Sequence, residues 1–174
     1  MLDVAVSYNR FKFLGHEFLT WLWYSIENEP DILKNSENES VSLEIGNRIV
    51  LENRIGDSME TITIKGDDAG LEEGMLSLEK GAVVTELNLS YKEGDQEWNF
   101  TVKGESLSIA NLKIPNSSQI ELKEDIENAI IEKSFFYYKV IQLIDSLYGQ
   151  FIHKRVSIDW NNTIRISLKR WIQQ

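Results

Sequence analysis

The feature that most constrains the fold is a run of large apolar side chains between residues 14 and 27. These side chains point in nearly every direction around a helix axis, so the helix predicted here has no polar face wide enough for solvent. A helix of this kind is stable only when other elements cover it on most sides. The sequence therefore predicts that five residues of this helix lie in the core or in an interface: Phe18, Trp21, Leu22, Trp23 and Tyr24.

The same run is too short to cross a membrane. Its longest apolar stretch is residues 18–26, whereas a membrane-spanning helix needs about 20 apolar residues. Charged side chains such as Arg10 and Glu17 interrupt residues 1–17, which leaves no continuous apolar segment of a secretory signal. We therefore expect a cytoplasmic protein that does not contact a membrane.

Period-two alternation of apolar and polar residues predicts six antiparallel strands. Residues 41–45 and 49–51 alternate on either side of Gly46-Asn47, and we expect a hairpin there because both turn residues tolerate a positive φ. The other predicted strands cover residues 59–65, 82–91, 98–102 and 107–114. The strands are expected to form one or two small sheets.

Helical spacing predicts two or three further helices. A short one begins after Asp67 or Asp68, whose side chain would cap it, and ends at Gly81. The residues from 156 onward fit a strand or a helix, of which we favour the helix. A long helix covers about residues 122–153, with a core stripe of Ile130, Tyr137, Ile141, Ile144, Tyr148 and Phe151, widened by Ile131, Phe135, Tyr138 and Ile152.

Together these elements predict an α+β fold of about six antiparallel strands with three or four helices. The chain of 174 residues is long enough for one ordinary domain, so we expect a single domain over residues 1–174. Residues 28–40 are the only linker candidate.

The residue types available do not favour catalysis. The chain has no Cys, which excludes thiolate nucleophiles and Cys-bound metals, and His16 and His153 belong to no ligand-spaced pair. Gly56-Asp57-Ser58 lacks the second glycine of a nucleophile elbow. We predict no metal, no cofactor and no catalytic residue. A hydrolase with buried carboxylates stays an alternative, because a sequence does not show the burial that raises a carboxyl pKa.

Charge is unevenly distributed along the chain. The whole sequence has 28 acidic and 18 basic residues and a net charge of −10. Residues 150–174 reverse this balance, since Asp159 is their only acidic residue. A basic surface on an acidic body suits contact with phosphates or with an acidic face of another subunit. The basic residues in question are Lys154, Arg155, Arg165, Lys169 and Arg170.

Glu17 stands among Phe and Trp residues, where a carboxylate must find a donor or meet water. We expect it to accept a hydrogen bond at a helix terminus or to pair with an arginine such as Arg10. The aromatic residues 135–138 are of the type that stacks on single-stranded bases, but their helical spacing favours core or interface positions.

Two longer motifs resemble the RdgC family of bacterial recombination-associated proteins. Residues 13–24 are similar to the aromatic helix of that family, and residues 78–89 to its strand of a glycine, then Val-Val-Thr, then alternating Leu. Further matches follow in the same order along most of the chain: Trp98-Asn99-Phe100, Leu112-Lys113-Ile114-Pro115, and Arg155, Trp160 and Trp171. They correspond to the C-terminal half of a typical member.

The resemblance implies sequence-independent binding of double-stranded DNA, a place in the nucleoid, a role in recombination and replication, and a homodimer that encircles the duplex. The family label of a putative exonuclease finds no readable motif here. From charge alone, the DNA-contacting candidates are the five basic residues above, with Arg48 and Arg54 as second choices. The alternative is a structural or dimerisation domain without DNA binding of its own, in which the apolar helix over residues 18–24 docks a partner or a second copy.

Overall fold

A computed structural model describes residues 4–66, 69–116 and 123–173 of the chain. It shows an α+β fold with one antiparallel five-stranded sheet in the order β2-β1-β3-β4-β5. The strands are β1 (Ser42–Ile55), β2 (Ser58–Lys65), β3 (Val83–Glu93), β4 (Gln96–Lys103) and β5 (Ser108–Lys113). The helices are α1 (Val4–Asn28), α2 (Ala69–Glu79), α3 (Lys123–Val156) and α4 (Arg165–Ile172). The predicted fold class is confirmed, with five strands in place of six.

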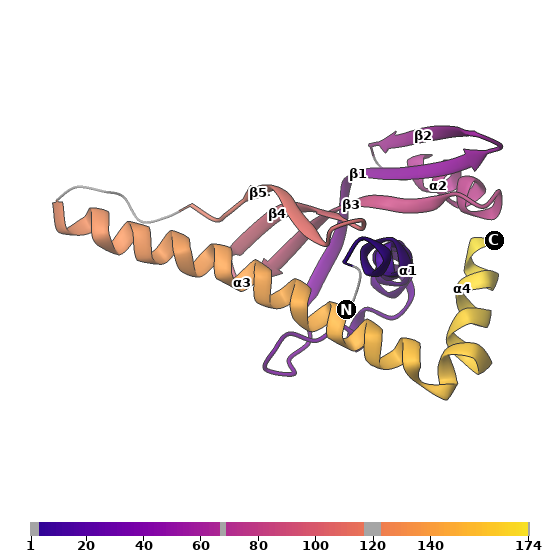
Figure 1. Cartoon of the computed structure of the whole chain (residues 1–174). Helices are drawn as coiled ribbons and strands as arrows, with labels where there is room; N and C mark the ends of the chain where they lie inside the picture. Colours follow the sequence, from indigo (N-terminus) through magenta and orange to yellow (C-terminus); the bar gives the residue numbers. More distant parts are fainter. Residues whose placement is uncertain (1–3, 67–68, 117–122, 174) are drawn as a thin grey trace.

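The helices are arranged around α1. Both α1 and α3 lie on the same side of the sheet, and α4 turns back beside α1, so that α1 is enclosed between the sheet, α3 and α4 (Figure 1). The helix that is apolar all round thus has neighbours on several sides, as its sequence requires. The five side chains predicted for its core face are at most 7% exposed.

Two glycines allow the close packing of α1. A Cβ at Gly15 would lie 1.7 Å from the carbonyl oxygen of Gly104, in the turn between β4 and β5. A Cβ at Gly74 of α2 would lie 2.7 Å from the Trp23 ring. The backbone of α1 therefore touches the edge of the sheet directly, and α2 approaches the indole of Trp23.

A single strand, β1, runs through Gly46-Asn47, so the hairpin predicted at these residues is wrong. The pairing of β1 with β3 shifts register here, which is a bulge within one strand. A Cβ at Gly46 would lie 2.0 Å from Asn88 Oδ1, and the amide of Asn47 donates to that same oxygen at 3.2 Å. Gly46 is thus needed for the close approach of a neighbouring side chain. The turn lies instead between β1 and β2 at Gly56, whose φ is 61°.

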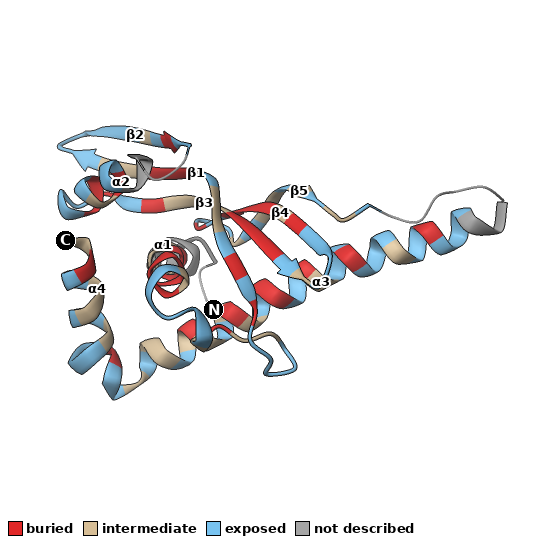
Figure 2. Cartoon of the chain, turned by 180° about the vertical axis from the view of Figure 1, so that it is seen from behind, coloured by how far each residue is buried: buried red, intermediate tan, exposed pale blue. Residues whose placement is uncertain are grey.

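The long helix α3 is confirmed, and the second half of its predicted core stripe is confirmed at Ile144, Tyr148 and Phe151, which are buried or packed against the core. The first half of the predicted stripe is wrong. Ile130, Tyr137 and Ile141 were expected in the core and are 59%, 48% and 54% exposed. The buried residues of α3 form a row along one side of the helix, seen as its red segments in Figure 2: Ala129, Phe136, Val140, Leu143, Ile144, Leu147 and Phe151. The first half of α3 is apolar on both sides, and periodicity alone does not tell which side is covered.

The tail of the chain is helical, as favoured from the sequence. A π-helical turn, η2 (Trp160–Ile164), leads into α4. The Trp171 ring meets the Trp23 ring edge-on at 5.3 Å between centroids. Both indoles donate to one carboxylate, that of Glu27, at 2.6 Å from Trp23 and 3.1 Å from Trp171. These contacts attach α4 to α1.

The segment between α1 and β1 is joined to α3. It contains a short 3-10 turn, η1 (Pro30–Ile32), and a bridge between Lys34 and Ser40. The side chain of Gln150 donates to the carbonyl of Lys34 at 2.6 Å and accepts from its amide at 3.3 Å. Asp67 and Asp68, the predicted cap of α2, lie outside the described residues.

Candidate functional site

The basic residues of the C-terminal segment lie where α3 ends and the chain turns through η2 into α4. Three of them, Arg165, Lys169 and Arg170, are exposed, and two are partly buried. The partly buried pair is in the last turn of α3, where a cation interacts favourably with the helix dipole. We call this set the basic corner: Lys154, Arg155, Arg165, Lys169 and Arg170.

Arg155 is held in place by α1. Its Nε donates to Glu17 Oε2 at 2.8 Å, and its guanidinium lies 5.1 Å from the centre of the Trp160 ring. Glu17 was expected to pair with an arginine, and the partner is Arg155 from the other end of the chain. The side chain of Arg10, the arginine suggested from the sequence, lies outside the described residues. The ion pair fixes the end of α3 against α1.

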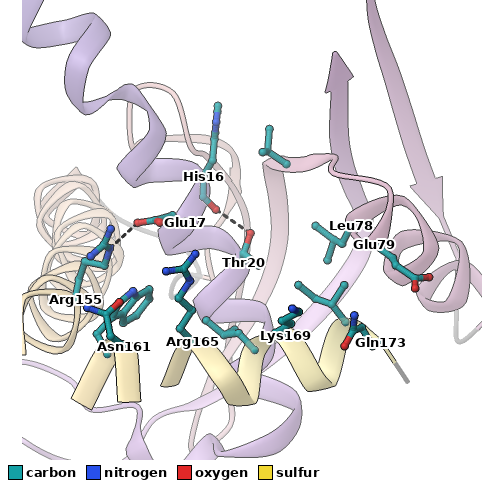
Figure 3. Close-up of a pocket in the computed structure, with 14 residues that line it drawn as sticks. His16, Glu17, Thr20, Leu78, Glu79, Arg155, Asn161, Arg165, Lys169 and Gln173 are labelled. Carbon is teal, nitrogen blue, oxygen red and sulfur yellow. Dashed lines mark hydrogen bonds and ion pairs between the residues drawn. The ribbon is translucent and has the colours of Figure 1, made fainter. Parts of the chain in front are cut away.

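A cleft of about 650 Å³ adjoins this ion pair. Its volume is within the range of small-molecule sites, about 300–1,000 Å³. The polar lining comes from α1, from the end of α2 and from the C-terminal segment that starts in the last turn of α3 (Figure 3): His16, Glu17, Thr20, Glu79, Arg155, Asn161, Arg165, Lys169 and Gln173. The remaining lining is apolar: Leu78, Val83, Trp160, Leu168 and Ile172. Three cations and two carboxylates thus share one concave space.

Arg165 and Lys169 are the cations of the cleft without a partner. They are one helical turn apart on α4, and neither has a hydrogen bond or ion pair with any residue that the structure describes. Two like charges at this spacing repel each other. An anion placed between them would remove that repulsion, and Figure 3 shows the guanidinium of Arg165 directed into the cleft.

The structure does not bring Arg48 and Arg54 to this cleft. The Nη1 of Arg48 lies 3.1 Å from Glu86 Oε2, in an ion pair on the sheet. It borders a separate groove of about 540 Å³, walled largely by the amide side chains of Asn47, Asn88, Asn99 and Asn111. Arg54 donates from Nε to the carbonyl of Gly56 at 3.4 Å, in the turn between β1 and β2.

The aromatic helix is not available to a partner. Phe18, Trp21, Leu22, Trp23 and Tyr24 are all buried in the core of this chain. The docking surface suggested for residues 18–24 is therefore wrong in this conformation. Of the aromatic residues 135–138, Phe136 is buried and packs edge-on against Trp98, whereas its three neighbours are exposed.

Sequence reasoning missed the walls of the cleft that α1, α2 and β3 supply. Leu78 and Val83 gave no signal of a site, because their roles depend on how distant segments meet. Only Glu17 was recognisable, since a carboxylate inside an aromatic run demands a partner.

The described part of the chain shows few features of a metal site, of an active site with buried carboxylates or of a membrane-spanning segment. No group of three or more metal-ligating side chains is found among the side chains that the structure describes, those of residues 14–66, 72–116 and 126–173. The buried polar residues found there are Ser25, Ser77, Ser90 and Thr101, so no described carboxylate is buried. Among these same residues, no helix is both long and apolar enough to span a bilayer.

Comparison with known proteins adds no relative to this picture. No protein-family model matches the chain, and a search of curated proteins finds no match. A function must therefore be argued from the basic corner and the cleft beside it.

Proposed function

We propose that the chain binds double-stranded DNA without sequence preference and without catalysis, through the basic corner. The resemblance to the RdgC family supports this reading, and with it a place in the bacterial nucleoid and a link to recombination and replication. Binding of this kind needs cations that contact phosphates and no groups that read bases.

The observation that carries the proposal is that three free cations gather on the single short helix α4, whereas three cations of the sheet are paired. Arg48, Lys92 and Lys103 each form an ion pair with a glutamate. By contrast, Arg165, Lys169 and Arg170 are exposed and have no ion pair with any residue in the described ranges. Free exposed cations attract phosphate, whereas paired cations would first have to give up a carboxylate.

The acidic remainder of the protein restricts where DNA can lie. The whole chain has a net charge of −10 although its C-terminal segment is basic, so most of the surface repels a polyanion. Attraction is thereby confined to the basic corner, and binding is expected to be weak and strongly dependent on salt.

The first test is fluorescence anisotropy of a labelled random duplex, titrated with the protein. If about four phosphates are contacted, affinity falls about 100-fold between about 50 and about 200 mM salt because counterions are released. Reversing two charges in Arg165→Glu/Lys169→Glu should abolish binding at the lower salt concentration.

The matched control is Lys113→Glu/Lys133→Glu, which makes the same change of net charge at two exposed lysines outside the basic corner. This control should retain most of the affinity. If both double variants lost DNA affinity equally, net charge alone would explain the effect. Wild-type binding that is absent at low salt, or that is equally strong at high salt, would contradict direct phosphate contact.

A second candidate function, self-association, is favoured by a different surface. We call it the α3 apolar face: Ile126, Ile130, Ile131, Phe135, Tyr137, Tyr138 and Ile141. These side chains are between 45% and 67% exposed. At about 200 Å² for a full side chain, roughly 800 Å² of apolar surface is open, which equals one side of a standard interface and exceeds the largest patch of a typical monomer.

Sedimentation velocity over a concentration series tests this second function. The wild-type chain should form a dimer as concentration rises, and Ile130→Ser/Ile141→Ser should shift the equilibrium to monomer. The control is Val156→Ser/Ile158→Ser, at two residues that are 77% and 80% exposed outside this face. A wild-type chain that stays monomeric at millimolar concentration would count against it.

A further inference from the structure

The cleft has a second chemical property besides its charge, an uncovered apolar wall. Val83 is 39% exposed, and Leu168 and Ile172 of α4 line the same space. Apolar side chains at a concave site gain free energy when a ligand removes them from water. The phosphate groups of DNA have no apolar surface, so the proposed DNA contact leaves this wall unused.

Two residues of the apolar wall, Leu168 and Ile172, belong to the same helix as the free cations. Arg165, Leu168, Lys169 and Ile172 follow one another at three- and four-residue spacing, and all four line the cleft. This spacing places them on one face of α4. One ligand in the cleft can therefore reach both kinds of group at once.

From this juxtaposition we infer that the cleft binds a small amphipathic carboxylate, whose acid group contacts Arg165 and Lys169. Its apolar body covers Val83, Leu168 and Ile172. The volume of about 650 Å³ holds a ligand of that kind, which buries most of its surface in a site of this size. Neither a bare inorganic anion nor a neutral hydrocarbon would use both groups.

The two carboxylates of the cleft limit the negative charge of a ligand that fits there. Glu17 is already paired with Arg155 and adds no unbalanced charge. Glu79 forms no ion pair with a described residue, and it lies with Gln173 away from Glu17 in the cleft (Figure 3). A second acid group on the ligand would meet Glu79 and be repelled. The site accordingly suits a monoanion with one polar end.

The backbone at the charged end of the cleft supports the assignment. Trp160 and Asn161 line the cleft and belong to the π-helical turn η2. Turns of this kind are rare within helices and occur frequently at functional sites. Here the turn brings the Trp160 ring and the Asn161 amide to the same space as Arg165.

The inferred site does not require DNA, but two of its cations also belong to the basic corner that is proposed to bind DNA. A ligand bound to Arg165 and Lys169 would compete with phosphate for the basic corner. The experiment below contains no DNA, so its failure leaves the proposed DNA binding untouched, and failure of DNA binding leaves this site untouched.

Isothermal titration calorimetry of the full chain with octanoate tests the inference. Octanoate should bind at one saturable site, whereas acetate, which lacks the apolar body, and octanol, which lacks the charge, should each bind at least about tenfold more weakly. Arg165→Gln/Lys169→Gln should weaken octanoate binding about tenfold or more, since both charge-assisted hydrogen bonds are lost.

The matched control is Lys113→Gln/Lys133→Gln, which removes two exposed cations that belong neither to the cleft nor to the basic corner. Its affinity for octanoate should equal that of the wild type. Equal binding of octanol would reveal general apolar adsorption, and equal binding of acetate a simple anion site. Each of these two results would overturn the inference. So would octanoate binding that does not saturate, or an unchanged octanoate affinity in Arg165→Gln/Lys169→Gln.

Discussion

Two helical glycines occupy opposite environments and give a direct test of the packing around α1. A methyl group at Gly15 would lie 1.7 Å from the carbonyl oxygen of Gly104, whereas one at Gly149 of α3 meets nothing within 4 Å. Gly15→Ala should therefore lower the free energy of unfolding by about 3 kcal/mol, because two backbones must separate. Gly149→Ala should raise it by about 0.5–1 kcal/mol through helix propensity.

Urea unfolding followed by circular dichroism measures both changes. The two variants share the same chemical substitution in a helix, so each is the control of the other. A neutral Gly15→Ala would show that α1 does not contact the β4–β5 turn as described.

Glu27 is a second residue whose role in the packing around α1 can be tested by substitution. Its carboxylate accepts from the indoles of Trp23 and Trp171, which are 0% and 5% exposed. Glu27→Ala leaves two donors without an acceptor and should destabilise the protein by about 1–3 kcal/mol. Glu27→Gln keeps one carbonyl oxygen and should cost less, as measured by the urea midpoint. If the two variants were equally damaging, the charge and not the acceptor would matter.

At the scale of the element, the two halves of α3 differ in how much of their apolar surface is buried. Val140, Leu143, Leu147 and Phe151 are at most 3% exposed, whereas most large side chains before them are open to solvent. Local opening is easiest where few apolar contacts must break. Hydrogen exchange followed by mass spectrometry should therefore show faster exchange over residues 126–135 than over residues 140–151. Uniform protection along α3 at low concentration would contradict this difference.

The elements themselves were largely predictable from sequence. The period-two and helical patterns found four of the strands and all the helices, including the tail helix. They failed at Gly46-Asn47, because a glycine needed for close contact with Asn88 looks the same in sequence as a glycine needed for a turn. They failed again in the first half of α3, where two apolar faces compete and only the tertiary fold decides which one is covered, whereas Ile144 and Phe151 in the second half are buried as predicted.

The candidate site was less predictable than the elements. The charge count located the basic corner, and the position of Glu17 showed that it needed a partner. The cleft itself arises from residues such as Thr20, Val83 and Lys169, which lie far apart in the chain. No local pattern encodes such a meeting, since it depends on how α4 returns to α1.

For the molecule as a whole, two buried tyrosines and one partly buried tyrosine predict loss of stability in alkali. Burial raises the pKa of Tyr148, and it is also the main reason why the pKa values of Tyr24 and Tyr91 are raised, with Glu29 and Glu39 adding to the shift. An unfolded phenol ionises near pH 10, before the folded ones. The folded state then holds more protons, so stability is complete below about pH 10 and falls as pH rises through the raised values.

Urea unfolding between about pH 9 and 11 measures this loss, with tyrosinate absorbance as the independent record of ionisation. Tyr148→Phe should reduce the slope of stability against pH, since one partly buried phenol with a raised pKa is removed. A slope unchanged in this variant would show that Tyr148 ionises equally easily in both states.

The enclosure of α1 has a consequence for synthesis on the ribosome. Two of the elements that enclose α1, the end of α3 and α4, come late: 138 residues separate Glu17 from Arg155, and 144 separate Glu27 from Trp171. At about 5–20 residues per second, the aromatic surface of α1 waits roughly 10–30 s for those partners to emerge. During that interval the nascent chain displays Trp21 and Trp23 to its surroundings. This protein is thus expected to be a client of chaperones that recognise exposed aromatic helices, and to aggregate when translation stops before α4.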